Sequence, residues 1–420
     1  MHIVNLPPEL VEEILVICDP VDVAQVAQTC TTFRSLIYQS KDSNLWRTLY
    51  LSQPLDDPRK CVSQDGQPKP QPIMWRTELQ RFVRARTVMD NPALLRKGEL
   101  EEILQTLMAL VCYVPAWITP SNSVDDDDEK GISEVSDNLM LVAALLGHDG
   151  FLDTLEVLPN QTFAEKMLLA RLHCYYGLTK NDVTNAAHAK SRAYVYNMRH
   201  YRPESDYGPF MPNGTVNWVH MQAIHHVVSM HVVDLRENQD FMFAIFPMTL
   251  PFTQIVLPEN ADAEEDWAGV NGKWQVAFCF CDHRELMGTL QEDLDETLFQ
   301  NPDFREVFRW LDVRLSVTKT EYDPKHPTKP IIHFFGEMQE PSSSTMTGKV
   351  KMTPDNQVQW HFVSGDSGNA IWSSEGIQVG GLRSFFGILG SWTTVFHEDD
   401  DPVGPFWMRR LRDEKKPVQH

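Results

Sequence analysis

The hydrophobic period of this chain changes near residue 240, and this change constrains the fold more than any other feature. Before it, apolar residues recur at the spacing of amphipathic helices, most clearly in residues 94–111. After it, apolar and polar residues alternate, as in residues 274–280 and 313–318, a pattern typical of strands with one buried face. About eight candidate strands separated by turn residues predict an antiparallel sandwich or barrel. The expected fold class is therefore α+β.

The same patterns divide the chain into four parts. Residues 1–52 predict a module of short helices, and residues 53–72, rich in proline, glycine and aspartate, predict a linker. Residues 73–235 predict a helical region, and residues 236–415 predict an antiparallel β-domain, barrel-like or sandwich. A helix at 304–311 is expected to be inserted in it. Further candidate strands are residues 331–335, 371–373, 377–379, 388–395 and 406–409.

The N-terminal module carries more apolar surface than its length can bury. Pro7 and Pro8 suit the first turn of a helix, where a missing N–H costs little, and Asp19-Pro20 ends that helix. Short helices totalling under about fifty residues cannot cover all of their apolar side chains by packing against each other. Part of this surface must therefore meet another domain or another chain.

The order of residues in this module resembles the F-box family. The chain reads Leu-Pro-Pro-Glu-Leu at residues 6–10, then Ile14-Leu15, then Cys-Thr-Thr-Phe-Arg at residues 30–34, then Leu45-Trp46. In that family the module binds a Skp-type adaptor, which links it to a cullin-RING ubiquitin ligase. The other interpretation is an incidental amphipathic helical hairpin. The resemblance implies an adaptor-facing set made of Leu6, Pro7, Leu10, Ile14, Leu15, Val23 and Val26.

Charge and cysteine usage limit the partners and the compartment. The formal net charge of −21 repels phosphate backbones, so we expect no nucleic-acid partner. No apolar run is long enough for a membrane span, and the acidic N-terminus does not resemble a signal peptide. The seven cysteines are scattered and odd in number, which favours free thiols. We therefore expect a chain of the cytoplasm, the nucleus or both, with no membrane partner.

Three patterns of residue types found in catalytic or metal sites have simpler interpretations. Residues 365–368, around Ser367, match the nucleophile motif of trypsin-like proteases, but the only faint histidine motif, at His188, falls in a helical stretch outside the β-domain. Cys279, Cys281 and His283 share one face of a strand, yet no second pair of ligands follows at zinc-site spacing. Four histidines crowd one predicted helix without the i, i+4 spacing of a zincin: His220, His225, His226 and His231. We expect no catalytic residue, no metal and no cofactor.

These observations favour a non-enzymatic adaptor that recruits a protein substrate for ubiquitylation. Because the first module is committed to the adaptor, the substrate is expected on the β-domain. The candidate residues are Trp372, Arg383 and Trp392, since tryptophan and arginine dominate interface hot spots. Arg383 at a barrel rim suits an acidic degron or a C-terminal carboxylate. The alternative is a barrel that binds a small ligand and is tethered or regulated through the F-box. A barrel interior filled by large apolar side chains would argue against it.

Overall fold

The N-terminal part consists of four short helices. The computed structural model describes residues 6–39, 43–119, 135–147, 150–233, 247–258, 265–286, 294–301, 304–339, 344–366 and 369–411. The helices are α1 (Pro8–Leu15), α2 (Pro20–Thr29), α3 (Thr31–Gln39) and α4 (Asn44–Leu51). The Asp19 carboxylate caps α2 by accepting the N–H of Val21 at 2.8 Å, and Pro20 occupies the first turn.

The fourth helix joins this domain to the helical region. Val11, Leu15, Val23 and other apolar residues of α1–α3 form a small core. In α4, the Tyr50 ring packs edge-on against Trp75 of the next helix, with ring centroids 5.6 Å apart. The domain is thus packed against its neighbour through α4 and does not depend on a covalent tether alone.

Residues 53–72, predicted as a linker, form a packed connection between the N-terminal domain and the helical region. Residues Cys61–Val62 (β1) pair with Val114–Pro115 (β2). The buried Asp56 carboxylate accepts the Ser136 hydroxyl and the backbone N–H groups of Asp137 and Asn138, the latter two at 3.1 Å. Burial nonetheless raises the pKa of Asp56. These contacts to residues about eighty positions away were not visible in the local composition.

The middle of the chain is helical, as predicted. Several helices begin at polar caps; for example, Thr162 and Glu165 form a capping box at the start of α9. No helix among the described residues combines the length and the apolar character needed to cross a bilayer. The helices are α5 (Trp75–Asp90), α6 (Leu100–Cys112), α7 (Asp137–Gly147), α8 (Phe151–Glu156), α9 (Phe163–Tyr176), α10 (Asn185–Val195) and α11 (Trp218–Val232), with short 3₁₀ turns at Pro92–Leu94, Met198–His200, Pro203–Ser205 and Leu250–Thr253.

The C-terminal part is a closed barrel of eight antiparallel strands. Each strand pairs with the next one in the sequence, and β12 pairs with β5 to close the barrel. This confirms the α+β class and decides for a barrel against a sandwich. The strands are β5 (Gly272–Cys281), β6 (Glu306–Glu321), β7 (Ile331–Gln339), β8 (Ser344–Met352), β9 (Val358–Asp366), β10 (Trp372–Gln378), β11 (Ile388–Thr394) and β12 (Gly404–Arg410).

Smaller elements flank the barrel. Trp117–Thr119 (β3) and Val256–Pro258 (β4) form a parallel pair, and α12 (His283–Leu286) and α13 (Glu296–Gln300) lie between β5 and β6. The helix predicted at 304–311 is wrong, because residues from Glu306 onward belong to β6. Apolar residues in that stretch repeat at helical spacing, but pairing with β5 overrides the local pattern.

Aromatic side chains fill the barrel interior. Trp360 is fully buried and contacts both Trp274 and Phe334, with ring centroids 5.2 and 5.5 Å apart. Gly348 on β8 leaves room for this cluster, since a Cβ there would lie 2.6 Å from the Phe334 ring. Further along, Phe406 contacts the rings of residues 278 and 362. The interior is a solid core, which argues against the small-ligand alternative.

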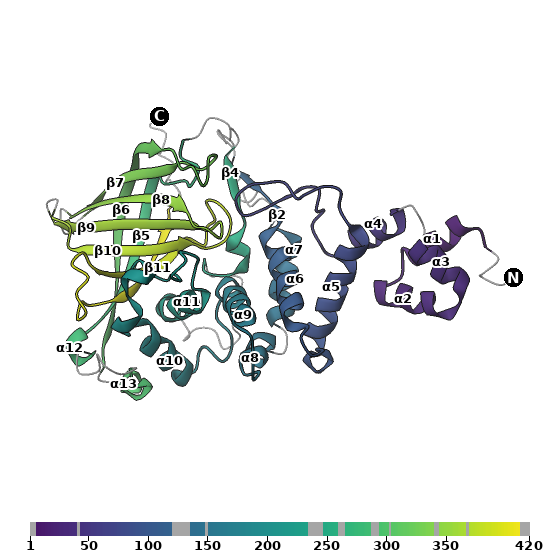
Figure 1. Cartoon of the computed structure of the whole chain (residues 1–420), viewed down its shortest axis with the longest axis horizontal. Coiled ribbons are helices and arrows are strands. Elements are labelled where there is room, and N and C mark those ends of the chain that lie inside the picture. Colours follow the sequence, from purple (N-terminus) through teal and green to yellow (C-terminus); the bar gives the residue numbers. More distant parts are fainter. Residues whose placement is uncertain are drawn as a thin grey trace, which may run out of the picture.

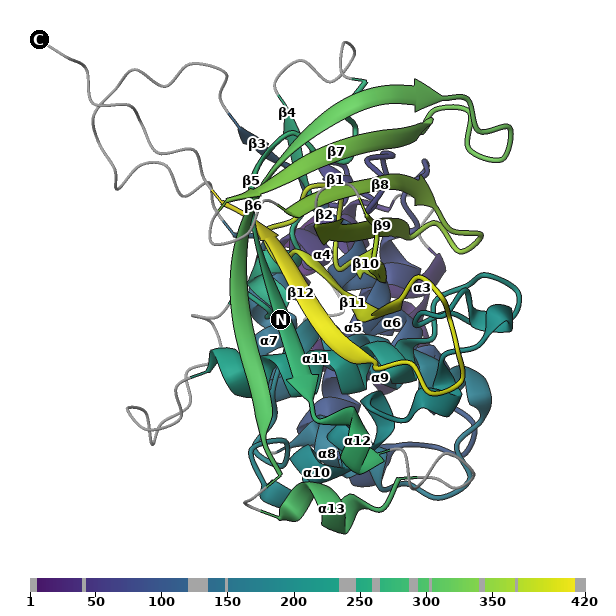
Figure 2. The same ribbon diagram turned by 90° about the vertical axis from the view of Figure 1, so that its left-hand side faces the viewer.

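The three parts lie in a row along the longest axis of the molecule (Figure 1). Helices α1–α3 lie at one end, the barrel lies at the other, and α5–α9 lie between them. Helix α11 packs against β11 and β12. Seen from the barrel end, α10, α11 and α13 lie along one side of the barrel (Figure 2).

Candidate partner-binding surfaces

An apolar strip crosses the first helix of the N-terminal domain. Leu10, Ile14 and Ile17 are 46%, 39% and 83% exposed, and Val21 at the start of α2 is 38% exposed. The first three follow the i, i+4, i+7 spacing of one helix face, although α1 ends at Leu15. Four exposed large apolar residues within one short segment mark an interaction surface. We call these four residues the α1 strip.

The structure divides the adaptor-facing residues predicted from sequence. Pro7 is exposed like Leu10 and Ile14, whereas Leu6 and Val26 are half-buried. Leu15 and Val23 are 3% and 0% exposed and belong to the domain's own core. A partner can reach the first group but not these two side chains. The sequence analysis missed Ile17 and Val21, although the helical spacing from Leu10 would have indicated Ile17.

The family comparison covers this same domain. The F-box-like family model matches residues 3–52. The chain therefore carries an F-box-like domain at its N-terminal end. The F-box supports a general role as an adaptor of SCF-type ubiquitin ligases, with a Skp-type subunit as the direct partner and a cullin behind it. Neither a curated protein nor a solved structure matches the chain.

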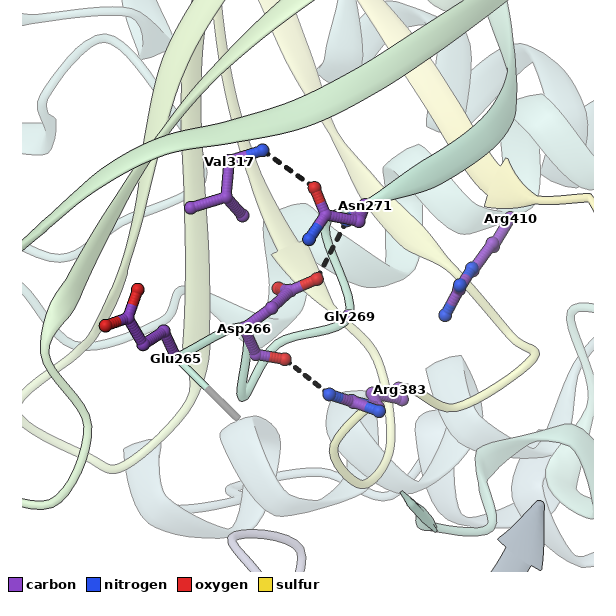
Figure 3. A pocket seen from close by; sticks show the side chains of 7 residues that line it. All are labelled: Glu265, Asp266, Gly269, Asn271, Val317, Arg383 and Arg410. Carbon is purple, nitrogen blue, oxygen red and sulfur yellow. Dashed lines mark hydrogen bonds between the residues drawn. The ribbon is translucent and has the colours of Figure 1, made fainter. Parts of the chain in front are cut away.

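A second surface of the chain is a pocket at one end of the barrel (Figure 3). Its volume is about 560 Å³. It lies where β5 begins and β12 ends, beside the loop between β10 and β11. The lining residues are Glu265, Asp266, Gly269, Asn271, Val317, Arg383 and Arg410.

The acidic side of this pocket is held by backbone hydrogen bonds. The Asp266 carboxylate accepts the N–H groups of Val270 and Asn271 at 2.7 and 2.9 Å. The Asn271 side chain in turn accepts the N–H of Val317 at 2.8 Å. These hydrogen bonds fix the position of the Asp266 carboxylate, which keeps its negative charge beside the cations of the pocket.

The basic side contains two guanidinium groups. Arg383 donates to the backbone carbonyls of Asp266 and Trp267 and so joins two loops at the rim. Its φ of 58° lies in the left-handed region, a backbone conformation that costs free energy for a non-glycine residue. Arg410 is exposed, and no hydrogen bond or ion pair links it to another residue in the described part of the chain. The pocket thus presents one anchored and one unpaired cation.

The other predicted substrate residues lie elsewhere. Trp372 and Trp392 contact each other edge-on, with ring centroids 5.2 Å apart, at the opposite end of the β10–β11 hairpin from Arg383. Trp392 is 4% exposed and donates its indole N–H to the carbonyl of Cys279 at 3.1 Å. The structure does not bring the three residues into one site. It places Arg383 in one pocket with Arg410, a residue that was not predicted from the sequence.

Of the two motifs that resemble a protease site, only the one around His188 lies entirely among the described residues. His188 lies in α10, in a helix as expected. Ser367 lies outside the described residues, as does the acidic run at residues 125–129. The side chain of His283 is likewise outside the description, although its backbone belongs to α12.

Proposed function

We propose that this chain is the substrate-recruiting subunit of an SCF-type ubiquitin ligase and performs no chemistry itself. The Skp-type adaptor binds the α1 strip, and a protein substrate binds the end of the barrel at Arg383 and Arg410. The observation that carries the proposal is that the two surfaces lie on different parts of the molecule, the strip on α1 and the pocket on the barrel, and Figure 1 shows these two parts apart from each other. Such a role belongs to the cytoplasm or the nucleus.

Contacts along the chain support a fixed geometry between the two surfaces. Arg171 of α9 donates to Gln64 at 2.7 Å and to Gln357 at 3.3 Å, and its guanidinium lies 4.8 Å from the centre of the Trp218 ring. This one side chain therefore joins the connection at 53–72, α11 and the turn between β8 and β9. A rigid adaptor holds its substrate at a set distance from the ligase's catalytic subunit.

The chemistry of the pocket favours an acidic partner group. Guanidinium groups present planar forks of N–H donors that match the two oxygens of a carboxylate. Glu265 and Asp266 share the lining with the two arginines, and Arg410, which has no ion pair among the described residues, is the cation available to an acidic group on a chain of net charge −21. An acidic segment or a C-terminal carboxylate of the substrate fits this site.

Charge reversal at Arg410 tests this assignment. Full-length protein carrying Arg410→Glu should lose substrates that the wild type enriches, while the Skp-type adaptor is recovered unchanged. Arg309→Glu is the matched control, because Arg309 is also an exposed arginine of the barrel and does not line the pocket. Quantitative mass spectrometry of the co-purified proteins compares the three. Equal loss from both variants, or from neither, would show that the pocket is not the substrate site.

A further inference from the structure

Cysteine, histidine and glutamate side chains, which commonly bind metals, lie close together on the outer face of the barrel. They lie at the end of the barrel opposite the rim pocket. Cys279 and Cys281 point outward from β5, because the residues between and before them face the aromatic interior. Glu306 of β6 lies directly opposite Cys281 in the strand register. His231, in the last turn of α11, approaches the same face.

Three ligand atoms of this cluster converge. The thiol sulfur of Cys279, an imidazole nitrogen of His231 and a carboxylate oxygen of Glu306 all lie within 4.8 Å of one another. Nε2 of His231 is 2.9 Å from Oε2 of Glu306, the distance of an ion pair. The two side chains therefore already approach the same point as the Cys279 sulfur.

The cluster is shielded from water. Cys279 is fully buried, and the side chains of Glu306 and His231 are 4% and 21% exposed. Burial raises the pKa of the Cys279 thiol well above its ordinary value, so the free thiol is protonated.

We propose that Cys279, His231 and Glu306 bind a Zn²⁺ ion that fastens α11 to the barrel. Thiolate, imidazole and carboxylate are the three ligand types that zinc takes in proteins. Binding releases the Cys279 proton, and the thiolate and the Glu306 carboxylate together neutralise the two charges of the ion. Three protein ligands leave one position of a tetrahedral site for water or for Cys281.

Arg192 does not block this site. Its Nε lies 3.1 Å from Oε2 of Glu306, but its Nη1 donates to the carbonyl of Phe299 at 3.1 Å, and the guanidinium packs on the rings of Phe299 and Phe304. Tyr196 donates to the other carboxylate oxygen. These two residues fix the orientation of the Glu306 carboxylate, as hydrogen-bond partners of zinc ligands do.

The spacing of the ligands along the sequence does not predict this site. Cys279, Cys281 and His283 form half of a familiar zinc pattern, but the remaining ligands come from a helix about fifty residues earlier and from the next strand. Only the pairing of β5 with β6 and the packing of α11 bring them together.

Metal analysis and cobalt spectroscopy of the full-length protein test the proposal. Wild-type protein dialysed against Zn²⁺ and then against metal-free buffer should retain one zinc per chain. Replacement by Co²⁺ should give the near-ultraviolet absorption of a thiolate–cobalt bond. Cys279→Ser should lose this band, and Cys174→Ser, another fully buried cysteine in α9, should keep it.

His231→Gln is a second test in case Cys279→Ser does not fold, because the His231 side chain is partly exposed and glutamine is similar to histidine in size. This variant should weaken Zn²⁺ binding by more than about 100-fold, since even the loss of a residue that only orients a metal ligand costs about 10- to 100-fold. Wild-type protein without stoichiometric zinc, a thiolate–cobalt band that persists in Cys279→Ser, or unchanged zinc affinity in His231→Gln would each overturn the proposal.

Discussion

The F-box and the barrel differ in where their large apolar residues lie. In the F-box, four large apolar side chains of the α1 strip remain exposed beside a small buried core. In the barrel, two groups of aromatic contacts lie inside, and a rim pocket with two arginines faces outward. The F-box thus gathers four exposed apolar residues in one short segment, whereas the barrel has a large aromatic interior and exposes apolar residues such as Val307, Trp310 and Phe335 on its strands.

This difference matches two kinds of association. Apolar surfaces that need cover favour stable association, because burying them removes them from water. Charged pockets give specificity and fast encounter more than raw affinity. Of the two proposed contacts, the adaptor contact at the α1 strip would therefore be the more stable, and the substrate contact at the barrel rim the more selective.

The largest effect is expected from Leu10→Asp combined with Ile14→Asp. Placing two carboxylates in the α1 strip should weaken adaptor binding by at least about 2 kcal/mol, roughly 30-fold, because a desolvated charge opposes the interface. A pull-down of full-length protein with purified Skp-type adaptor measures this. Val157→Asp, at a residue that is 80% exposed in the helical region, is the control. Undiminished recovery of the adaptor by the double variant would refute the strip as its binding site.

Trp360→Ala should instead damage the barrel and leave the adaptor bound. Removing this fully buried ring should lower the free energy of unfolding by about 3–5 kcal/mol, measured by chemical denaturation. Trp310→Ala, at a tryptophan that is 38% exposed on the barrel surface, should cost about 1 kcal/mol or less. Equal losses would mean that the aromatic interior does not carry the barrel's stability.

The smallest effect concerns a buried charge in the helical region between the two ends. His173 lies 2.8 Å from Asp182, and it also contacts Glu156; these carboxylates raise its pKa to about 10 despite its burial. The free energy from protonated His173 is full below its unfolded pKa of about 6.5 and is lost as the pH rises through about 10. The stability difference between wild type and His173→Gln should therefore shrink over this range.

Denaturation at several pH values measures this difference. His333→Gln, at an exposed pair with Glu321, should follow the pH profile of the wild type. A difference between wild type and His173→Gln that stays constant from pH 6.5 to 10 would show that His173 is not charged in the folded protein.

Helices and strands that depend on neighbouring residues could be predicted from the sequence, whereas contacts between distant residues could not. Helical periodicity and the spacing of Leu-Pro and Cys-x-x-Phe-Arg predicted the F-box, and alternation predicted β5 and part of β6. Both signals lie within a few neighbouring residues. The packed connection at 53–72 was missed because Asp56 is satisfied by residues 136–138.

The candidate sites follow the same division. Apolar residues on α1 could be selected from sequence, but not which of them point outward: Leu10 and Leu15 have the same character, and only packing separates them. Arg383 could be selected for its residue type. Its companion Arg410 could not, because the closure of the barrel brings β12 beside β5 and places the two arginines at one rim.

Closure of the barrel also limits how a partner can be recognised. Many peptide-binding domains extend a sheet by pairing its edge strand with the ligand backbone. Here every barrel strand has a neighbour on both sides, although strand ends that extend past a partner, such as residues 306–311 and 316–321 of β6, are paired on one side. Along the rest of the barrel a partner cannot add a strand, so discrimination there must come from side chains and loops at the barrel ends. Peptides with equal β-propensity but different terminal charge should therefore differ in binding.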